Sequence, residues 1–334
     1  MMRKNYPFVS IIIVNWNGKN MLKDCLISIR KISYPKKKYE VIVVDNGSTD
    51  GSVELLRSKF KWSKIVELDK NYGFAIPNNY GAKIAKGKYL VFLNNDTLVD
   101  KNWLIELVKP LEKDKSIGAG TSKILYWSRP RVINAMGGFW TLFGFPGLIG
   151  DGERDDKFQD TRTVFFPSGC SMIIRSELFK KLGGFDSDYF LYCEDVDLGW
   201  RIWNDGKKVI VIPTSVVYHK KSVTARSLNI NAYYYSTRNS LATILKNARR
   251  RDIWWMVPFF LLSHFLALLW LIFQGKVMEG KGILKGIKDC FKMLEKINQK
   301  RKMVNKSGLA NLKMGKLAEN ILLLIKVIRR YSSF

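Results

Sequence analysis

The sequence predicts an α/β protein in which a mostly parallel central sheet carries helices on both faces, followed by a C-terminal helical region. Four short apolar runs rich in β-branched residues stand in the first hundred positions, at 8–14, 40–45, 64–68 and 88–96. Segments with helical spacing of apolar residues separate them, at 19–32, 51–60 and about 78–86. Strands that are apolar on both faces and alternate with helices are typical of a parallel sheet.

The composition allows a large core and gives the two parts of the chain different charges. Of 334 residues, 47% are hydrophobic, and the net charge is +27. Residues 231–334 hold 20 Lys and Arg against 5 Asp and Glu, which indicates nucleic acid, anionic lipid or plain solvent as their surroundings. The four cysteines lack metal-ligand spacing, and their sparseness suits a reducing compartment and argues against a disulfide scaffold. The apolar run at 8–14 is too short for a secretory signal.

The remaining elements follow in chain order. Residues 125–165, rich in Gly and aromatic residues, predict loops or a hairpin. More elements are expected between residues 168 and 219: a short strand and a short helix in 168–186, a helix from 194 to Gly206, and strands at 207–213 and 215–219. From about 229 the spacing is helical to the end of the chain.

Polar residues end the predicted strands of the first third, with "NWNG", "DNGSTDGS" and "NNDT" after the first, second and fourth runs. Ligands of open α/β sheets bind beyond the carboxyl ends of the strands, so this edge is the expected site. Asp45 either accepts hydrogen bonds from a nucleobase or belongs to an ordinary turn in which Asp50 or Ser52 caps the next helix. No GxGxxG follows the first strand, which disfavours a dinucleotide site.

Asp96 and His219 are candidate metal ligands. Asp96 ends the run "FLNNDT" and could hold Mg²⁺ or Mn²⁺ together with phosphate and water, although Asp96 or Thr97 could instead cap a helix. His219 follows a strand, and both a metal or phosphate contact and a structural role stay open. His264 lies inside an apolar helix, where a structural role is expected.

An acidic cluster stands among aromatic residues in "FLYCEDVDLGWR", residues 190–201. Acids are costly to desolvate unless they are paired, solvated or used in chemistry. In a helix, Glu194 and Asp197 share a face at i, i+3, and Asp195 lies on another. One acid is therefore a candidate general base, while the others cap the helix or pair with Arg201.

Taken in order, the motifs resemble the family 2 glycosyltransferases, which have the GT-A fold. The matching stretches, within residues 8–245, are "VSIIIVNWNG", "VIVVDNGSTDGS", "NYGFAIPNNYGAKIAKGKYLVFLNNDT", "SGCSMIIR", "GGFDSDYFLYCEDVDLGWR" and "VVYHKKSVT". The subgroup looks like rhamnosyltransferase-type enzymes of cell-surface polysaccharide synthesis. The resemblance implies a GT-A catalytic domain over 1–230, with a nucleotide-sugar half at about 1–125 and an acceptor half at about 126–230. The charge and apolar pattern of residues 231–334 predict a basic, helical, membrane-associated region after it.

The resemblance also implies a role for each matching residue. Asp195 would be the catalytic base, and Asp96 with His219 would bind the divalent metal, Mg²⁺ or Mn²⁺. Residues implied near the nucleotide-diphosphate sugar are Asn15, Asn17, Asp45, Ser48, Asn71, Gly73, Phe74, Asn94, Asn95 and Arg201. Residues implied in the acceptor region are Tyr192, Glu194 and Trp200.

Two departures from the family pattern stand out. The metal motif reads Asn94–Asn95–Asp96, with one carboxylate, a form associated with the rhamnosyltransferase-like subgroup. Ile76–Pro77 replaces the small glycines that commonly follow "NYGFA", and Pro77 is expected to remove an N–H and widen that loop.

The expected reaction is an inverting transfer of a hexosyl-type sugar from the donor to an acceptor hydroxyl. Asp195 would take the acceptor proton, and the metal would stabilise the departing diphosphate. Two rival interpretations stay open: a sugar nucleotidyltransferase, or a basic membrane- or nucleic-acid-binding protein with an inactive α/β domain. Nucleic acid is not an expected partner.

Residues 253–273 form an uncharged run of 21, long enough to span a bilayer, with a buried core helix as the alternative. Beyond it, residues 281–297 carry an apolar stripe and a basic stripe at helical spacing. Basic residues flank the apolar run on both sides. A single crossing is disfavoured, because it would place one basic flank outside, whereas basic residues tend to stay on the cytoplasmic side. We therefore expect a hairpin-like or interfacial insertion at the cytoplasmic face of an anionic cell membrane, serving a lipid-linked or glycan acceptor.

Overall fold

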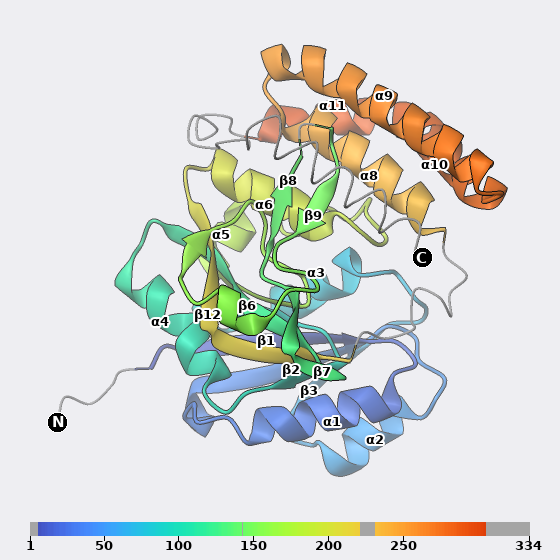
Figure 1. The fold of residues 1–334 in the computed structure, drawn as a ribbon. Helices are drawn as coiled ribbons and strands as arrows, with labels where there is room; N and C mark the ends of the chain where they lie inside the picture. The colour runs from blue at the N-terminus through green and yellow to red at the C-terminus, as the bar shows by residue number, and fades with distance from the viewer. Residues whose placement is uncertain (1–5, 142, 221–230, 305–334) are drawn as a thin grey trace.

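A computed structural model describes residues 6–141, 143–220 and 231–304, with one mixed sheet at its centre (Figure 1). The strands of this sheet are β1 (Val9–Asn15), β2 (Tyr39–Asp45), β3 (Lys64–Glu67), β4 (Tyr89–Leu93), β5 (Thr97–Val99), β6 (Ile117–Tyr126), β7 (Arg129–Ala135), β10 (Arg162–Thr163), β11 (Ser171–Arg175) and β12 (Lys208–His219). Their order is β10–β12–β6–β11–β4–β1–β2–β3, with β5 paired to β12 and β7 paired to β6. Strands β1 to β4 run parallel, whereas β11 is antiparallel to β4 and β6.

Helices cover both faces of the sheet, because alternate residues of each buried strand point to opposite faces. On β1, Val9, Ile11 and Ile13 belong to one core and Ile12 to the other. The first core is covered by α1 (Lys19–Arg30), α2 (Ser52–Lys59) and α4 (Trp103–Lys113). The second is covered by α3 (Ala75–Ile84), α5 (Ser176–Lys181) and α6 (Glu194–Asn204). The predicted α/β class with helices on both faces is confirmed.

Some element boundaries differ from those predicted. Helix α3 begins at Ala75 rather than near residue 78, so Pro77 lies in its first turn, where an N–H has no intrahelical partner. The expectation that Pro77 widens a loop is therefore wrong. The two strands expected between 207 and 219 are one strand, β12, with an irregular register between Ile212 and Val216. Strands β5 and β6 and helix α4 were not predicted.

Residues 125–165 contain the hairpin that was one of the two expected possibilities. Its strands are β8 (Gly138–Trp140) and β9 (Pro146–Leu148), which pair antiparallel. The Phe143 carbonyl near its tip accepts a hydrogen bond from Ser263 Oγ at 3.1 Å, which links the hairpin to the C-terminal helices. Residues Lys36–Lys38 and Asp155–Lys157 form the short 3₁₀ helices η1 and η2.

Four C-terminal helices form a layer above α6 and the hairpin, coloured orange to red in Figure 1. They are α8 (Ala232–Asn247), α9 (Arg250–Phe273), α10 (Val277–Lys292) and α11 (Leu294–Met303). A third core, which includes Trp140, Trp200, Leu241 and Phe260, joins this layer to the α/β part. Among the described helices, α9 alone is long and apolar enough to cross a membrane. The expected helical spacing at 305–334 lies outside the described residues, and the domain boundary near 230 stays a prediction.

Candidate active site

The carboxyl ends of three parallel strands bring the polar strand-end residues to one edge of the sheet. Strand β1 lies between β2 and β4, and Asn15 stands opposite Asp45 in the register. Asn95, which follows β4, donates from Nδ2 to Asn15 Oδ1 at 2.8 Å. The strand ends that the sequence pattern pointed to therefore meet.

The turn after β2 is held by its own side chains. Asp45 accepts hydrogen bonds from the Ser48 N–H at 2.8 Å and from Asn15 Nδ2 at 3.2 Å, one on each carboxylate oxygen. Asn17 donates its N–H to Ser48 Oγ at 2.9 Å, and its Oδ1 accepts from the Thr49 N–H at 2.8 Å. Asn17 has a φ of 48°, which Asn tolerates better than most residues. The network shapes the turn, and a contact between Asp45 and a nucleobase stays a prediction.

Asn46 ties the next loop of the site to the sheet, a role that no sequence motif indicated. Its Nδ2 donates to Asn71 Oδ1 and to the Gly73 carbonyl, both at 2.9 Å. Gly73 has a φ of 79°, and a Cβ there would stand 2.0 Å from the Phe190 carbonyl oxygen. The Phe74 N–H donates to that same carbonyl at 2.8 Å. Only glycine fits at position 73, and the loop connects the sheet edge to the segment before α6.

Asp96 and His219 lie side by side, as the metal hypothesis requires. His219 Nε2 is 3.2 Å from Asp96 Oδ2, and His219 Nδ1 is 2.8 Å from Asn134 Oδ1. In the tautomer that carries its proton on Nδ1, the Nδ1–H donates to Asn134 Oδ1 and Nε2 turns its lone pair toward the carboxylate. Two acceptor atoms in this arrangement suit a shared cation, and carboxylate with imidazole suits Mn²⁺. Among the described residues, no group of three or more His, Cys, Asp or Glu is placed to hold a metal ion.

Asp195 stands in the first turn of α6, directly after Glu194. Its Oδ2 accepts from the Gly169 N–H at 2.9 Å, and its Oδ1 accepts from the Val196 N–H at 2.8 Å. Burial raises the pKa of Asp195 to about 6, and burial followed by the charge of Asp195 raises the pKa of Glu194 further. The higher of the two pKa values belongs to Glu194, so Asp195 is the carboxyl that ionises first and the better candidate for a general base. Tyr192 is half-buried in the turn before the helix.

A short stretch of backbone, Ser168–Cys170, connects the two ends of the candidate site. The Gly169 N–H binds Asp195, and the carbonyl of Cys170 accepts from the Asn94 N–H at 3.0 Å. Asn94 begins the Asn94–Asn95–Asp96 motif. The candidate base and the motif of the candidate metal-binding acid are therefore held by the same stretch, for which the sequence pattern indicated only a strand.

Arg201 and Trp200 are buried in helix packing. Arg201 contacts Asp197 Oδ2 through Nε at 2.9 Å and through Nη2 at 2.7 Å, and it donates to two backbone carbonyls. The structure shows the ion pair that was one alternative for Arg201 and does not bring its guanidinium to the donor-side residues. Trp200 packs edge-on against Trp140 in the third core, so its aromatic ring contributes to packing between α6 and the hairpin.

The fold is that of a GT-A protein, and the family follows from the sequence match. Residues 10–183, just over half of the chain, match Glycosyl transferase family 2. The chain belongs to this family. The O-antigen biosynthesis protein RfbC of Myxococcus xanthus is 30% identical over 232 residues, which are 66% of this chain and 18% of that protein. The chain spans less than half the length of curated relatives that it matches.

Solved structures share the fold across almost the whole chain. S. aureus TarS 1-349 has a TM-score of 0.59 at 18% identity, covering 97% of this chain and 91% of that one. The mannosyltransferase PcManGT from Pyrobaculum calidifontis, in complex with GDP-Man and Mn²⁺, has a TM-score of 0.55 at 19% identity, covering 94% and 89%. These similarities establish the GT-A fold. At identities of 18% and 19%, the ligands of these proteins are not by themselves those of this chain.

Proposed function

We propose that this chain transfers a sugar from a nucleotide-diphosphate sugar to an acceptor hydroxyl with inversion at the anomeric carbon. The observation that carries the proposal is the Ser168–Cys170 stretch, which holds Asp195 and the Asn94–Asp96 motif together. A base and a polar edge suited to a diphosphate are the two parts that such a transfer needs. The mannosyltransferase with bound GDP-Man and Mn²⁺ supports a nucleotide sugar and a divalent metal as ligands.

In the proposed reaction, Asp195 accepts the proton of the acceptor hydroxyl while the oxygen of that hydroxyl attacks the anomeric carbon. The bond between the anomeric carbon and the diphosphate oxygen breaks, and the nucleoside diphosphate leaves with the bonding electron pair. Asp96 and His219 would hold a divalent metal, whose charge stabilises the negative charge of the leaving diphosphate. Attack from the face opposite the leaving group makes inversion the expected outcome.

The proposed process is synthesis of a cell-surface polysaccharide or glycoconjugate. The name of the Myxococcus relative, an O-antigen biosynthesis protein, supports this. Placement in the rhamnosyltransferase-like subgroup, with a hexosyl-type donor, rests on the resemblance of the motifs, of which Asn94–Asn95–Asp96 is one. A lipid-linked glycan is the acceptor we propose, because the C-terminal helices offer a surface for lipid.

The test uses the purified full chain and a lipid-linked sugar as acceptor, with UDP-glucose, dTDP-rhamnose and GDP-mannose in turn, each with Mn²⁺, Mg²⁺ or EDTA. We expect metal-dependent release of nucleoside diphosphate from one of them, and a product of opposite anomeric configuration by NMR. A retained configuration would refute the inverting mechanism. Pyrophosphate formed from a sugar 1-phosphate and a nucleoside triphosphate would instead identify a nucleotidyltransferase.

We also propose that the enzyme works on the cytoplasmic face of a membrane with α9 in the plane of the surface. One stripe along α9 is buried against the protein: Met256, Phe260, Ser263, His264 and Leu271. Elsewhere α9 exposes large apolar side chains: Trp254, Phe259, Leu262, Phe265, Leu266, Leu269, Trp270, Ile272 and Phe273. Because the buried stripe runs along the helix, α9 could cross a bilayer only together with the helices and hairpin packed on it.

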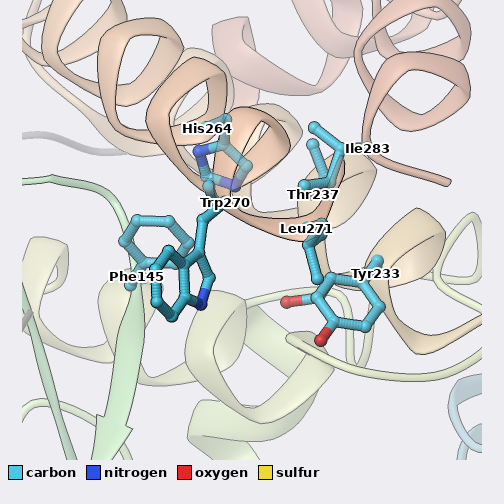
Figure 2. Close-up of a pocket in the computed structure, with 9 residues that line it drawn as sticks. Phe145, Tyr233, Thr237, His264, Trp270, Leu271 and Ile283 are labelled. Atoms are coloured by element: carbon cyan, nitrogen blue, oxygen red, sulfur yellow. The ribbon is translucent and has the colours of Figure 1, made fainter. Parts of the chain in front are cut away.

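The middle of α9 is fixed to the rest of the protein by aromatic stacking. The His264 ring stacks on Phe145, which lies between β8 and β9, with centroids 4.4 Å apart. On its other side it stacks on Phe260 of α9 itself, with centroids 3.8 Å apart. Figure 2 shows Phe145 and His264 on one side of an apolar pocket, with Tyr233 and Leu271 on the other. This packing holds α9 against α8 and the hairpin, which supports the in-plane placement.

Helix α10 places positive charge beside the apolar face. Its exposed side chains include Leu284 and Phe291 together with four lysines, Lys281, Lys285, Lys288 and Lys292. Apolar residues among lysines favour an anionic lipid surface, where each basic residue near the surface contributes about 1 kcal/mol.

Vesicle flotation of the full chain tests this placement, using phosphatidylcholine vesicles with and without phosphatidylglycerol. We expect flotation that increases with phosphatidylglycerol and is lost in Leu266→Glu/Leu269→Glu, while the matched exposed apolar substitution Ile27→Glu on α1 floats normally. A chain that stays in solution with anionic vesicles would refute attachment. A C-terminal tag accessible only from outside the cell would refute the cytoplasmic side.

A further inference from the structure

Two consecutive residues before α6 adopt a backbone conformation that is costly for any residue except glycine. Tyr192 has a φ of 69° and Cys193 a φ of 67°. Helix α6 begins at the next residue, and Asp195 stands in its first turn. A strained turn of this kind persists only where its surroundings determine it. The contacts around the turn therefore show what sets the position of Asp195.

One buried amide of α8 supplies the central contacts. Asn239 Nδ2 donates to the carbonyl of Leu191 at 2.9 Å and to the carbonyl of Tyr192 at 2.8 Å. Asn239 Oδ1 accepts from Arg238 Nε at 2.9 Å, which fixes the orientation of the amide. Arg238 also donates to the carbonyl of Asp188 at 3.0 Å, earlier in the same loop. The carbonyls of Leu191 and Tyr192, at the start of the strained turn, are thus held by one fully satisfied side chain.

Other contacts join this loop to α8 and to the donor side. The Phe190 ring stacks on Tyr235 of α8 with centroids 5.6 Å apart, and the Phe190 carbonyl is the one that accepts from the Phe74 N–H. Cys193 Sγ lies 3.4 Å from Ser240 Oγ, the residue after Asn239. The loop is therefore held between the donor-side loop and α8, and Asn239 holds its strained end.

We infer that Asn239 is a positioning residue for the transfer reaction: by holding the Leu191 and Tyr192 carbonyls it fixes the turn that directs Asp195 toward the acceptor hydroxyl. The inference rests on the proposed role of Asp195 as the base. Displacing a reacting group by about 1 Å can cost about 10²-fold in rate, so a side chain that controls the turn controls turnover without touching substrate.

Helix α8 offers a matched control for a purely structural role. Asn247 is also fully buried, and its Nδ2 donates to Asp197 Oδ1 at 2.8 Å. Asp197 belongs to the same helix as Asp195 but pairs with Arg201 and Lys246. Losing Asn247 should therefore weaken packing between α8 and α6 without disturbing the turn.

The experiment compares Asn239→Ala, Asn239→Ser and Asn247→Ala in the full chain, with nucleoside diphosphate release from the sugar nucleotide that the wild type uses. We expect Asn239→Ala to lower kcat by about 10- to 10²-fold with little change in KM for the donor. Asn239→Ser, which keeps one donor, should fall between Asn239→Ala and the wild type, and it carries the test if the Ala variant does not fold. Asn247→Ala should lose thermal stability and keep kcat per folded molecule.

Hydrogen exchange gives a readout that does not depend on activity. Amides from Tyr192 to Val196 should exchange faster in Asn239→Ala and not in Asn247→Ala. A folded Asn239→Ala with wild-type kcat and unchanged exchange would overturn the inference. Asp195→Asn distinguishes the base role of Asp195 from the positioning role of Asn239. If Asp195→Asn is inactive while Asn239→Ala is fully active, only the positioning role fails. An active Asp195→Asn overturns the base assignment and the positioning role with it.

Discussion

Replacing Lys246 with Met should destabilise the protein by about 3 kcal/mol, because Lys246 links two buried carboxylates. Its side chain is 4% exposed, and Nζ lies 2.5 Å from Asp186 Oδ2 and 2.6 Å from Asp197 Oδ1. Met has a similar length without the charge, and removing one partner of a buried ion pair costs about 3–5 kcal/mol. The lower end applies, because each carboxylate keeps one cation: Lys300 for Asp186 and Arg201 for Asp197.

Thermal unfolding at pH 7 measures this effect. Unfolding entropy is about 2.1 cal/mol/K per residue, so for 334 residues a loss of 3 kcal/mol lowers Tm by about 4 °C. Burial alone would raise the pKa of Asp186, but the charges of Lys246 and Lys300 hold it well below its usual range. A carboxylate whose pKa is lower in the folded than in the unfolded protein stabilises the fold at pH values above its unfolded pKa, near 4. That stabilisation is lost as the pH falls through the pKa of the folded protein. The difference between wild type and variant should therefore shrink as the pH falls below about 4.

A surface ion pair on α10 provides the control. Lys292 Nζ lies 3.0 Å from Asp289 Oδ1, and the Lys292 side chain is 65% exposed. Lys292→Met should cost less than about 0.5 kcal/mol, since exposed pairs contribute little. A Tm of Lys246→Met equal to that of Lys292→Met would refute the reasoning, because it would show that the buried carboxylates do not need the charge of Lys246.

Three further predictions concern the reaction itself. Asp195→Asn should lower kcat by about 10²- to 10⁴-fold while thermal shifts with the sugar nucleotide stay close to wild type. The wild-type kcat/KM should fall as the pH drops below about 6, where Asp195 takes up a proton and loses its function as a base. Retention of more than about a tenth of wild-type turnover by Asp195→Asn would contradict the role. Asp96→Ala should weaken Mn²⁺-dependent binding of the sugar nucleotide and leave binding of the free nucleoside unchanged, and equal donor binding of the wild type with and without EDTA would contradict the metal assignment.

The α/β class and the site edge could be predicted because their signals are local. Each strand of the first third is a continuous apolar run, and a polar turn follows directly. Parallel strands end at one edge, so Asn15, Asp45 and Asn95 had to come close once the strands paired. The packing of Trp200 could not be predicted in the same way. The resemblance implied Trp200 in the acceptor region, and the structure shows its ring packed in a core against Trp140 of the hairpin, which lies 60 residues away in the sequence.

The side chains that hold the site could not be predicted, because each acts across a long stretch of sequence. Asn134 reaches His219 and Asn239 reaches Leu191 only after the sheet and the helices have packed. A single Asn within a helical or strand pattern has no signature of its own, and a side-chain amide in a helix is ordinarily solvated. The positive φ of Tyr192 could not be predicted from the sequence either, because tertiary contacts determine such a conformation at a residue other than glycine.

Helix α8 belongs at once to the proposed membrane layer and to the machinery that holds the base. Through Asn239 it holds the turn before α6, and it packs directly against α9 and α10. Deleting residues 250–334 should release the catalytic part from membranes, but it would also remove Lys300 from Asp186 and expose the α8 surface that α10 covers. Loss of activity in such a truncation would therefore say nothing about a need for lipid. Substitutions on the exposed face of α9, such as Leu266→Glu/Leu269→Glu, leave α8 and its contacts in place, and they should separate membrane binding from turnover on a soluble acceptor.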